Sequence, residues 1–231
     1  MQAYENALNF VMYEKDKTTT EKKKFDTFSV PLGLLDYINP IMYCITMATV
    51  IRNLYSVMGK PANVIFLIGA VISVFFGLII PTGKVLVGLG VIRFRMPVSL
   101  VFCVNIGILV SGLMLFHFVM DLNLIALVIL IAVILVSLAF VYQKSKKVNT
   151  IAVLTGAVGY LLLYTSLITL SIRRLAVLPI VLYAFAILLF VMLCVIGIKA
   201  DLKNPKVHWV IEVSNVLCQT LVAGATIILF S

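Results

Sequence analysis

Four long runs without a charged side chain decide what this chain can fold into. They cover residues 96–120, 122–143, 148–172 and 175–198. About 20 apolar residues cross the hydrocarbon core of a bilayer as a helix, and each run exceeds that length. The chain is 63% hydrophobic and 12% charged, so little sequence remains for a soluble domain. The pattern predicts an all-α, polytopic membrane protein, because a helix satisfies its own backbone hydrogen bonds in lipid.

Three less uniform segments complete a predicted set of seven transmembrane helices. The first covers about residues 34–57 and is the most polar of the seven. The second covers about residues 62–80 and is expected to end at Pro81, and the last begins at Trp209, a residue type found at membrane interfaces. Only residues 121–123 join the third and fourth spans. These two spans are therefore expected to pack as antiparallel neighbours.

Positive charge is distributed unevenly among the connections between these spans. The richer side would hold Lys15, Lys17, Lys22, Lys23, Lys24, Lys84, Arg93, Arg95, Lys144, Lys146, Lys147, Lys199, Lys203 and Lys206. The poorer side would hold Arg52, Lys60, Arg173 and Arg174. Cytoplasmic loops carry the excess of Lys and Arg, so we expect a cytoplasmic N-terminus and an external C-terminus. The short loops favour a multi-pass protein of a prokaryotic cytoplasmic (plasma) membrane.

Residues 1–32 are expected to form a cytoplasmic segment ahead of the transmembrane domain, which covers residues 33–231. Residues 1–14 form either a short helix on the membrane surface or a frayed terminus, and a lysine-rich linker follows. The first 30 residues lack the apolar stretch of a secretory signal peptide. A first span can itself act as an uncleaved insertion signal.

Basic side chains next to the spans are expected to contact lipid headgroups. The predicted contacts are Lys22, Lys23, Lys24, Arg173 and Arg174. For the two arginines the alternative is an external mouth that attracts anions. The net charge of +9 does not indicate nucleic-acid binding, because no spread of exposed aromatic side chains accompanies the basic residues.

Small residues spaced four apart mark faces through which two of the spans are expected to pack. They are Gly69, Ser73 and Gly77 in the second span and Cys103, Gly107 and Ser111 in the third. Such faces let helix backbones approach closely, which is how helices associate in lipid. The pattern predicts packing and says little about function.

Polar side chains recur along one face of the first and last spans, where lipid contact would be unfavourable. We expect a polar cleft, open to the cytoplasm, whose substrate-binding lining is Asp36, Asn39, Tyr43, Asn105, Glu212, Asn215 and Gln219. The alternative is that these side chains only form hydrogen bonds between helices, each worth about 0.6 kcal/mol.

The sequence predicts neither a metal site nor a cofactor. His208 and Glu212 share a helix face and with Asp36 would offer cation ligands, but a helix-end interaction of Glu212 is the favoured interpretation. The four cysteines have no CxxC spacing. Neither HExxH nor GxSxG occurs, so we expect a protein that is not an enzyme.

An internal repeat is a further possibility. Residues 34–120 and 148–230 would each hold three spans in the same orientation, and an offset of 110 aligns Asn105 with Asn215. This layout resembles sugar and vitamin transporters built from three, one and three helices, whose substrates bind between the two halves. The chain lacks the Pro-Gln pair of the PQ-loop proteins, and Trp209 is its only tryptophan, unlike the tryptophan-rich nicotinamide-riboside carriers.

Two functions remain open at this point. The polar faces and the possible duplication favour a transporter or channel for a small solute. The alternative is a non-catalytic subunit, sensor or immunity protein that acts in a larger membrane assembly. The expected partners are membrane lipid, a small-molecule solute, and either a second copy or another membrane protein.

Overall fold

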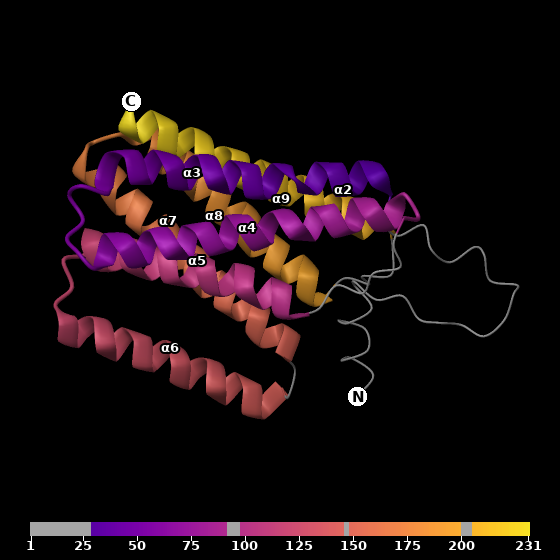
Figure 1. Ribbon diagram of the computed structural model, residues 1–231. Coiled ribbons are helices and arrows are strands. Elements are labelled where there is room, and N and C mark those ends of the chain that lie inside the picture. The colour runs from indigo at the N-terminus through magenta and orange to yellow at the C-terminus, as the bar shows by residue number, and fades with distance from the viewer. Residues whose placement is uncertain (1–28, 92–97, 146–147, 200–204) are drawn as a thin grey trace, which may run out of the picture.

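The computed structural model describes residues 29–91, 98–145, 148–199 and 205–231, and all regular structure within them is helical. Figure 1 shows the helices running roughly along one common direction. They are α2 (Val30–Asp36), α3 (Ile38–Leu54), α4 (Ala62–Gly88), α5 (Val98–Val119), α6 (Leu124–Ser145), α7 (Val148–Arg173), α8 (Val177–Lys199) and α9 (Pro205–Phe230).

Six helical segments of the described residues are long and apolar enough to cross a membrane. They are Val30–Leu54, Ala62–Gly88, Ser99–Val119, Thr150–Arg173, Val177–Ile196 and Lys206–Phe230, and a shorter apolar stretch, Ile125–Val141, lies in α6. The chain is therefore a multi-pass integral membrane protein whose apolar helices contact lipid. The expected surface helix of residues 1–14 and the three lysines Lys22, Lys23 and Lys24 lie outside the described residues.

The spans form a closed ring. Each of α3, α4, α5, α7, α8 and α9 packs on the next, and α9 packs back on α3. The helix α6 stands outside this ring, and Figure 1 shows it apart from the other helices. The expectation that the third and fourth spans pack as neighbours is wrong, because the main contact of α6 is with α7 rather than α5.

Glycine contacts explain why α6 is left out. A Cβ added at Gly107 of α5 would lie only 2.6 Å from the Gly69 carbonyl oxygen of α4. On α7, a Cβ at Gly159 would lie 2.6 Å from the Leu109 backbone nitrogen of α5. The helices α4 and α7 thus occupy the two faces of α5 that allow close backbone approach, and α6 contacts lipid instead. The exposed apolar side chains of α6 are Ile125, Val128, Ile129, Val133, Leu135, Val136 and Phe140.

The small residues predicted to pack do not all serve one interface. Gly69, Gly107 and Ser111 lie between α4 and α5, and the Ser73 hydroxyl of α4 donates to the Val104 carbonyl oxygen of α5 at 3.2 Å. Gly77 instead faces α3, where its added Cβ would lie 3.3 Å from Pro40 Cβ. Cys103 is half-buried on α5.

Two prolines shape the helices that carry the polar residues. Pro40 cannot donate to the carbonyl of Asp36 four residues earlier, and the helix is interrupted at Tyr37 between α2 and α3. The second span does not end at Pro81 as expected, because α4 continues through this buried proline to Gly88. Thr82 next to it donates its hydroxyl to the Leu78 carbonyl of the preceding turn at 2.7 Å.

Replacing Gly107 with alanine is expected to destabilise the fold by about 1–3 kcal/mol, because the new methyl group overpacks against the α4 backbone. Gly224→Ala is the matched control, since a Cβ there meets nothing within 4 Å. That change is expected to leave stability unchanged or to raise it by up to about 1 kcal/mol. Thermal unfolding in detergent measures both, and equal effects would contradict the close α4–α5 contact.

Candidate functional site

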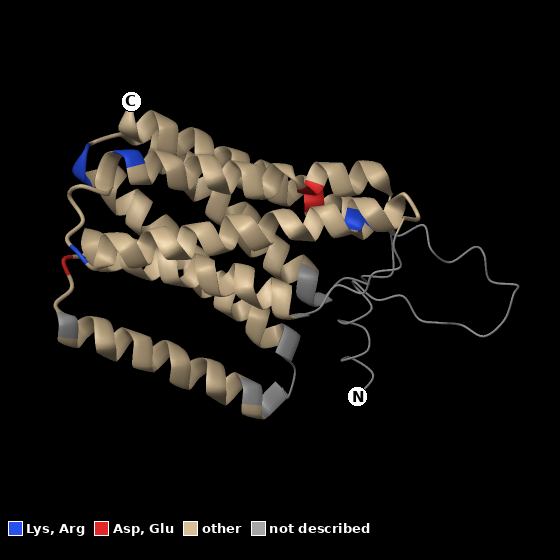
Figure 2. Cartoon of the chain, viewed as in Figure 1, with Lys and Arg blue, Asp and Glu red and all other residues tan. Residues whose placement is uncertain are grey.

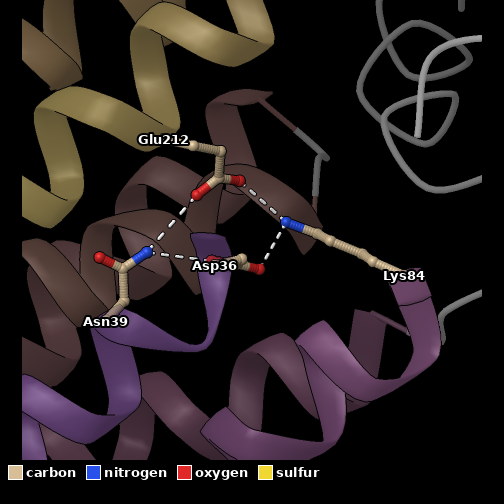
Figure 3. Close-up of polar contacts among 4 residues, drawn as sticks. All are labelled: Asp36, Asn39, Lys84 and Glu212. Carbon is tan, nitrogen blue, oxygen red and sulfur yellow. Dashed lines mark hydrogen bonds and ion pairs between the residues drawn. The ribbon is translucent and has the colours of Figure 1, made fainter. Parts of the chain in front are cut away.

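A compact network of four polar side chains lies at one end of the bundle (Figure 3). The Lys84 ammonium is 2.7 Å from Asp36 Oδ2 and 2.9 Å from Glu212 Oε1. On the opposite side of the two carboxylates, Asn39 Nδ2 donates to Asp36 Oδ1 at 3.0 Å and to Glu212 Oε2 at 3.4 Å. Each carboxylate oxygen therefore receives one donor. We call these four residues the Lys84 cluster.

The Lys84 cluster is buried. Its four side chains belong to residues that are between 5% and 9% exposed, with Glu212 at 5% and Asn39 at 9%. Two carboxylates face one ammonium, so an ionised cluster carries one net negative charge. Removing such charges from water costs several kcal/mol per ion, and contact with an opposite charge is what offsets that cost. Each charged side chain of the cluster therefore stays buried at acceptable cost only while its partners in the cluster are present.

Four helices, from three distant parts of the sequence, supply the cluster. Asp36 ends α2 and Asn39 opens α3, Lys84 lies in the last turns of α4, and Glu212 lies two turns into α9. In the ring, α3 stands between α4 and α9. The buried Lys84–Glu212 contact therefore joins two helices that are not neighbours in the ring, and it ties the second span to the last.

Lys84 is the site residue that sequence reasoning missed. It was assigned to a cytoplasmic loop because Pro81 was expected to end the second span. A signal was present, since apolar residues continue at positions 85–87 and fit an uninterrupted helix. Figure 2 shows a basic residue beside the acidic ones near the end of the bundle where α2 lies.

The middle of the ring is filled by aromatic side chains. Tyr43 of α3 meets the edge of Tyr160 of α7, with ring centroids 6.3 Å apart, and its hydroxyl is 2.8 Å from the Ser111 hydroxyl of α5. Tyr160 and Tyr164 both pack on Phe190 of α8. The contacts of Tyr43 with α5 and α7 join helices that are not neighbours around the ring, so this side chain lies in its interior.

The remaining predicted lining residues are more dispersed. Gln219 is 3% exposed and approaches the Tyr160 hydroxyl in the interior. Asn105 donates to the Ala152 carbonyl at 2.8 Å across the α5–α7 interface, and Asn215 is half-buried on α9. The structure thus brings Asp36, Asn39 and Glu212 into one cluster, places Tyr43 and Gln219 beside the aromatic side chains, and leaves Asn105 at a separate interface.

The two arginines near the end of α7 have different surroundings. Arg174 donates to the Leu229 carbonyl at 3.0 Å and lies 4.8 Å above the ring of Phe230. Arg173 lines a cavity at the end of the bundle opposite the Lys84 cluster.

His208, the suggested metal ligand, is buried at 2% exposure, and no group of three metal-ligating side chains occurs among the described residues.

Comparison with known proteins supplies no assignment for this site. No protein-family model matches the chain, and neither a curated protein nor a solved structure is significantly similar to it. Chemically, the Lys84 cluster combines three ionisable groups with an amide in a water-poor place. Such a cluster holds helices together while its charges are paired. The helices can separate when one of the charges or contacts is lost.

Loss of the Lys84 charge is expected to be the most damaging single change in the cluster. Lys84→Met leaves two carboxylates buried without a cation, and breaking a buried pair in this way costs about 3–5 kcal/mol. Asp36→Asn or Glu212→Gln leaves a neutral ion pair, so each is expected to cost less. The triple variant that removes all three charges is expected to recover part of the loss caused by Lys84→Met.

Thermal unfolding and the yield of monodisperse protein in detergent provide the measurement. Arg52→Met is the control, because Arg52 is an exposed cation of the same chain. A Lys84→Met variant as stable as the Arg52→Met variant would mean that the cluster does not hold the helices together.

Proposed function

We propose that this protein is a small-solute transporter whose path runs through the ring of six helices. The observation that carries this function is the Lys84 cluster, a buried ionic contact that closes one end of a ring with polar and aromatic side chains inside it. Buried ionisable residues in membrane helices commonly mark substrate or ion pathways. The proposal assigns the protein no catalytic reaction.

The order of helices around the ring supports a duplicated design. The first half would comprise α2–α5 and the second α7–α9, with α6 as the linker and as the seventh span. Around the ring, α5 meets α7 and α9 meets α3, which is the order that two parallel triple-helix units would produce. Transporters of this plan bind substrate between their halves. The distribution of lysine and arginine favours a cytoplasmic position for the Lys84 cluster, an external C-terminus and a location in the plasma membrane.

In this view the Lys84 cluster is the cytoplasmic gate. Glu212 belongs to the second half, whereas Asp36, Asn39 and Lys84 belong to the first. Opening the path toward the cytoplasm requires α9 to leave α2 and α4, which separates these contacts. Deeper in the ring, the Tyr43 and Tyr160 side chains close the path a second time. The predicted substrate-binding residues Asn105, Asn215 and Gln219 are the candidates for polar contacts with a neutral or weakly polar solute.

A second candidate function follows from the position of α6. This helix contacts the ring mainly through α7 and exposes apolar side chains over much of its length. A membrane subunit that binds a partner helix beside α6 would have the same appearance. Native mass spectrometry of protein extracted gently from its own membrane separates the two functions, because a subunit brings a second polypeptide at fixed stoichiometry.

Opening of the gate is expected to expose Cys218, which is fully buried beside the Tyr164 hydroxyl. In a variant with the cysteines Cys44, Cys103 and Cys194 replaced by alanine, Glu212→Gln should accelerate labelling of Cys218 by a membrane-impermeant maleimide. A shift of about 1.4 kcal/mol in the opening equilibrium suffices for about tenfold faster labelling.

The side of labelling distinguishes opening from unfolding. An opened gate admits the reagent from the cytoplasmic side only, which inside-out and right-side-out vesicles compare directly. Equal labelling from both sides, or a rate that Glu212→Gln does not change, would argue against a gate at the Lys84 cluster.

Uptake into proteoliposomes tests transport itself with a broad panel of radiolabelled metabolites. For a transported solute, Asn105→Ala and Asn215→Ala are each expected to lower uptake about 2- to 10-fold, the effect of losing one hydrogen bond. Asn53→Ala is the matched control, because Asn53 bonds only to Thr49 of its own helix among the described residues. Silence across the whole panel, or uptake that neither variant changes, would count against a transporter.

A further inference from the structure

A second polar site lies at the end of the bundle away from the Lys84 cluster. It is a cavity of about 540 Å³ lined by Gly59, Lys60, Pro61, Ala62, His117, Phe118, Asp121 and Arg173. These residues come from the α3–α4 connection, the end of α5 with its connection to α6, and the end of α7. Lys60 precedes α4 and Lys84 lies near its other end, so the helix separates the two sites.

The charged side chains of this cavity make no contact among the described residues that would stabilise the fold. Lys60, Asp121 and Arg173 are exposed, and within the described residues none of them forms an ion pair or a side-chain hydrogen bond. His117 Nδ1 is buried and also lacks a hydrogen-bond partner there. Buried nitrogen atoms of this kind normally find a partner, so a bound group would complete the site.

The positions of the basic residues need an explanation beyond topology. Only Arg52, Lys60, Arg173 and Arg174 lie on this side of the membrane in the predicted topology, where Lys and Arg are otherwise scarce. Arg174 is engaged with Leu229 and Phe230. Two of the other three line the same cavity although they are more than a hundred residues apart in sequence.

We propose that this cavity binds a phosphate group, with Lys60 and Arg173 as its cationic contacts and His117 Nδ1 as a third polar contact. Arginine presents a planar fork that fits phosphate oxygens, and lysine adds a point charge. Asp121 reduces the net positive charge of the site, which suits one phosphate group rather than a polyanion. The group belongs either to a phospholipid headgroup or to free phosphate, and both meet the same contacts. This site stands independently of the proposed transport function.

Binding is measured on the full chain, purified and delipidated in dodecyl maltoside, a detergent without phosphate. Inorganic phosphate and a short-chain phosphatidylglycerol are the two probes, and native mass spectrometry with titration calorimetry gives stoichiometry and dissociation constant. We expect one bound equivalent. The double variant Lys60→Gln/Arg173→Gln should weaken binding at least about tenfold, because each lost contact is a charge-assisted hydrogen bond.

Two matched variants make the outcome decisive. Arg52→Gln removes a cation from the same side without touching the cavity and should leave binding unchanged, whereas Asp121→Asn should tighten it. Binding of the lipid alone assigns a headgroup site, and binding of inorganic phosphate as well assigns a site for free phosphate. The proposal is overturned if neither probe binds, or if Arg52→Gln weakens binding as much as the double variant. Unliganded thermal stability shows that each variant is folded.

Discussion

The buried ionic contact between Lys84, Asp36 and Glu212 is the constraint on which the arrangement of the first, second and last spans depends. An apolar side chain is equally stable against lipid or against another helix, so apolar packing alone gives membrane helices little reason to choose a partner. Charged side chains are different, because they are tolerated inside the bundle only while they contact a side chain of opposite charge. The pairs at 2.7 and 2.9 Å therefore fix which faces of α2, α4 and α9 meet. Asn39 completes the contact by donating to both carboxylates.

Much of the helical content was predictable, and the arrangement of the helices was not. Length and lack of charge identify a span, because the bilayer imposes both. Each of the six long apolar helices of the structure overlaps a span predicted from the sequence, although the second continues past its expected end at Pro81 to Gly88. The ring order depends on which small residues face one another, and Gly69 of α4 faces Gly107 of α5. A four-residue spacing in the sequence does not reveal which other helix such a face will contact. For the same reason the short connection at residues 121–123 did not make α6 a neighbour of α5.

The candidate site shows the same division between local and distant information. The repeat of polar residues along single helices identified Asp36, Asn39 and Glu212 as side chains that avoid lipid, and they meet in the structure. Lys84 was missed because Pro81 permits two outcomes. A proline at position 40 interrupts a helix, whereas the buried proline at 81 is crossed by one. Which outcome occurs depends on partners that the tertiary structure supplies, such as the carboxylates that receive Lys84.

The two ends of the bundle differ in how their charged side chains are used, because the charges are paired at one end and unpaired at the other. At the Lys84 cluster every carboxylate oxygen has a donor, and the residues are buried. Around Lys60, Asp121 and Arg173 the charges are exposed and face a cavity. Closing that second end in the manner of the first would require Asp121 to pair with a cation across the cavity, and the described side chains make no such pair. The charges of the Lys84 cluster are therefore spent on holding helices together, whereas those around the cavity stay available for a ligand.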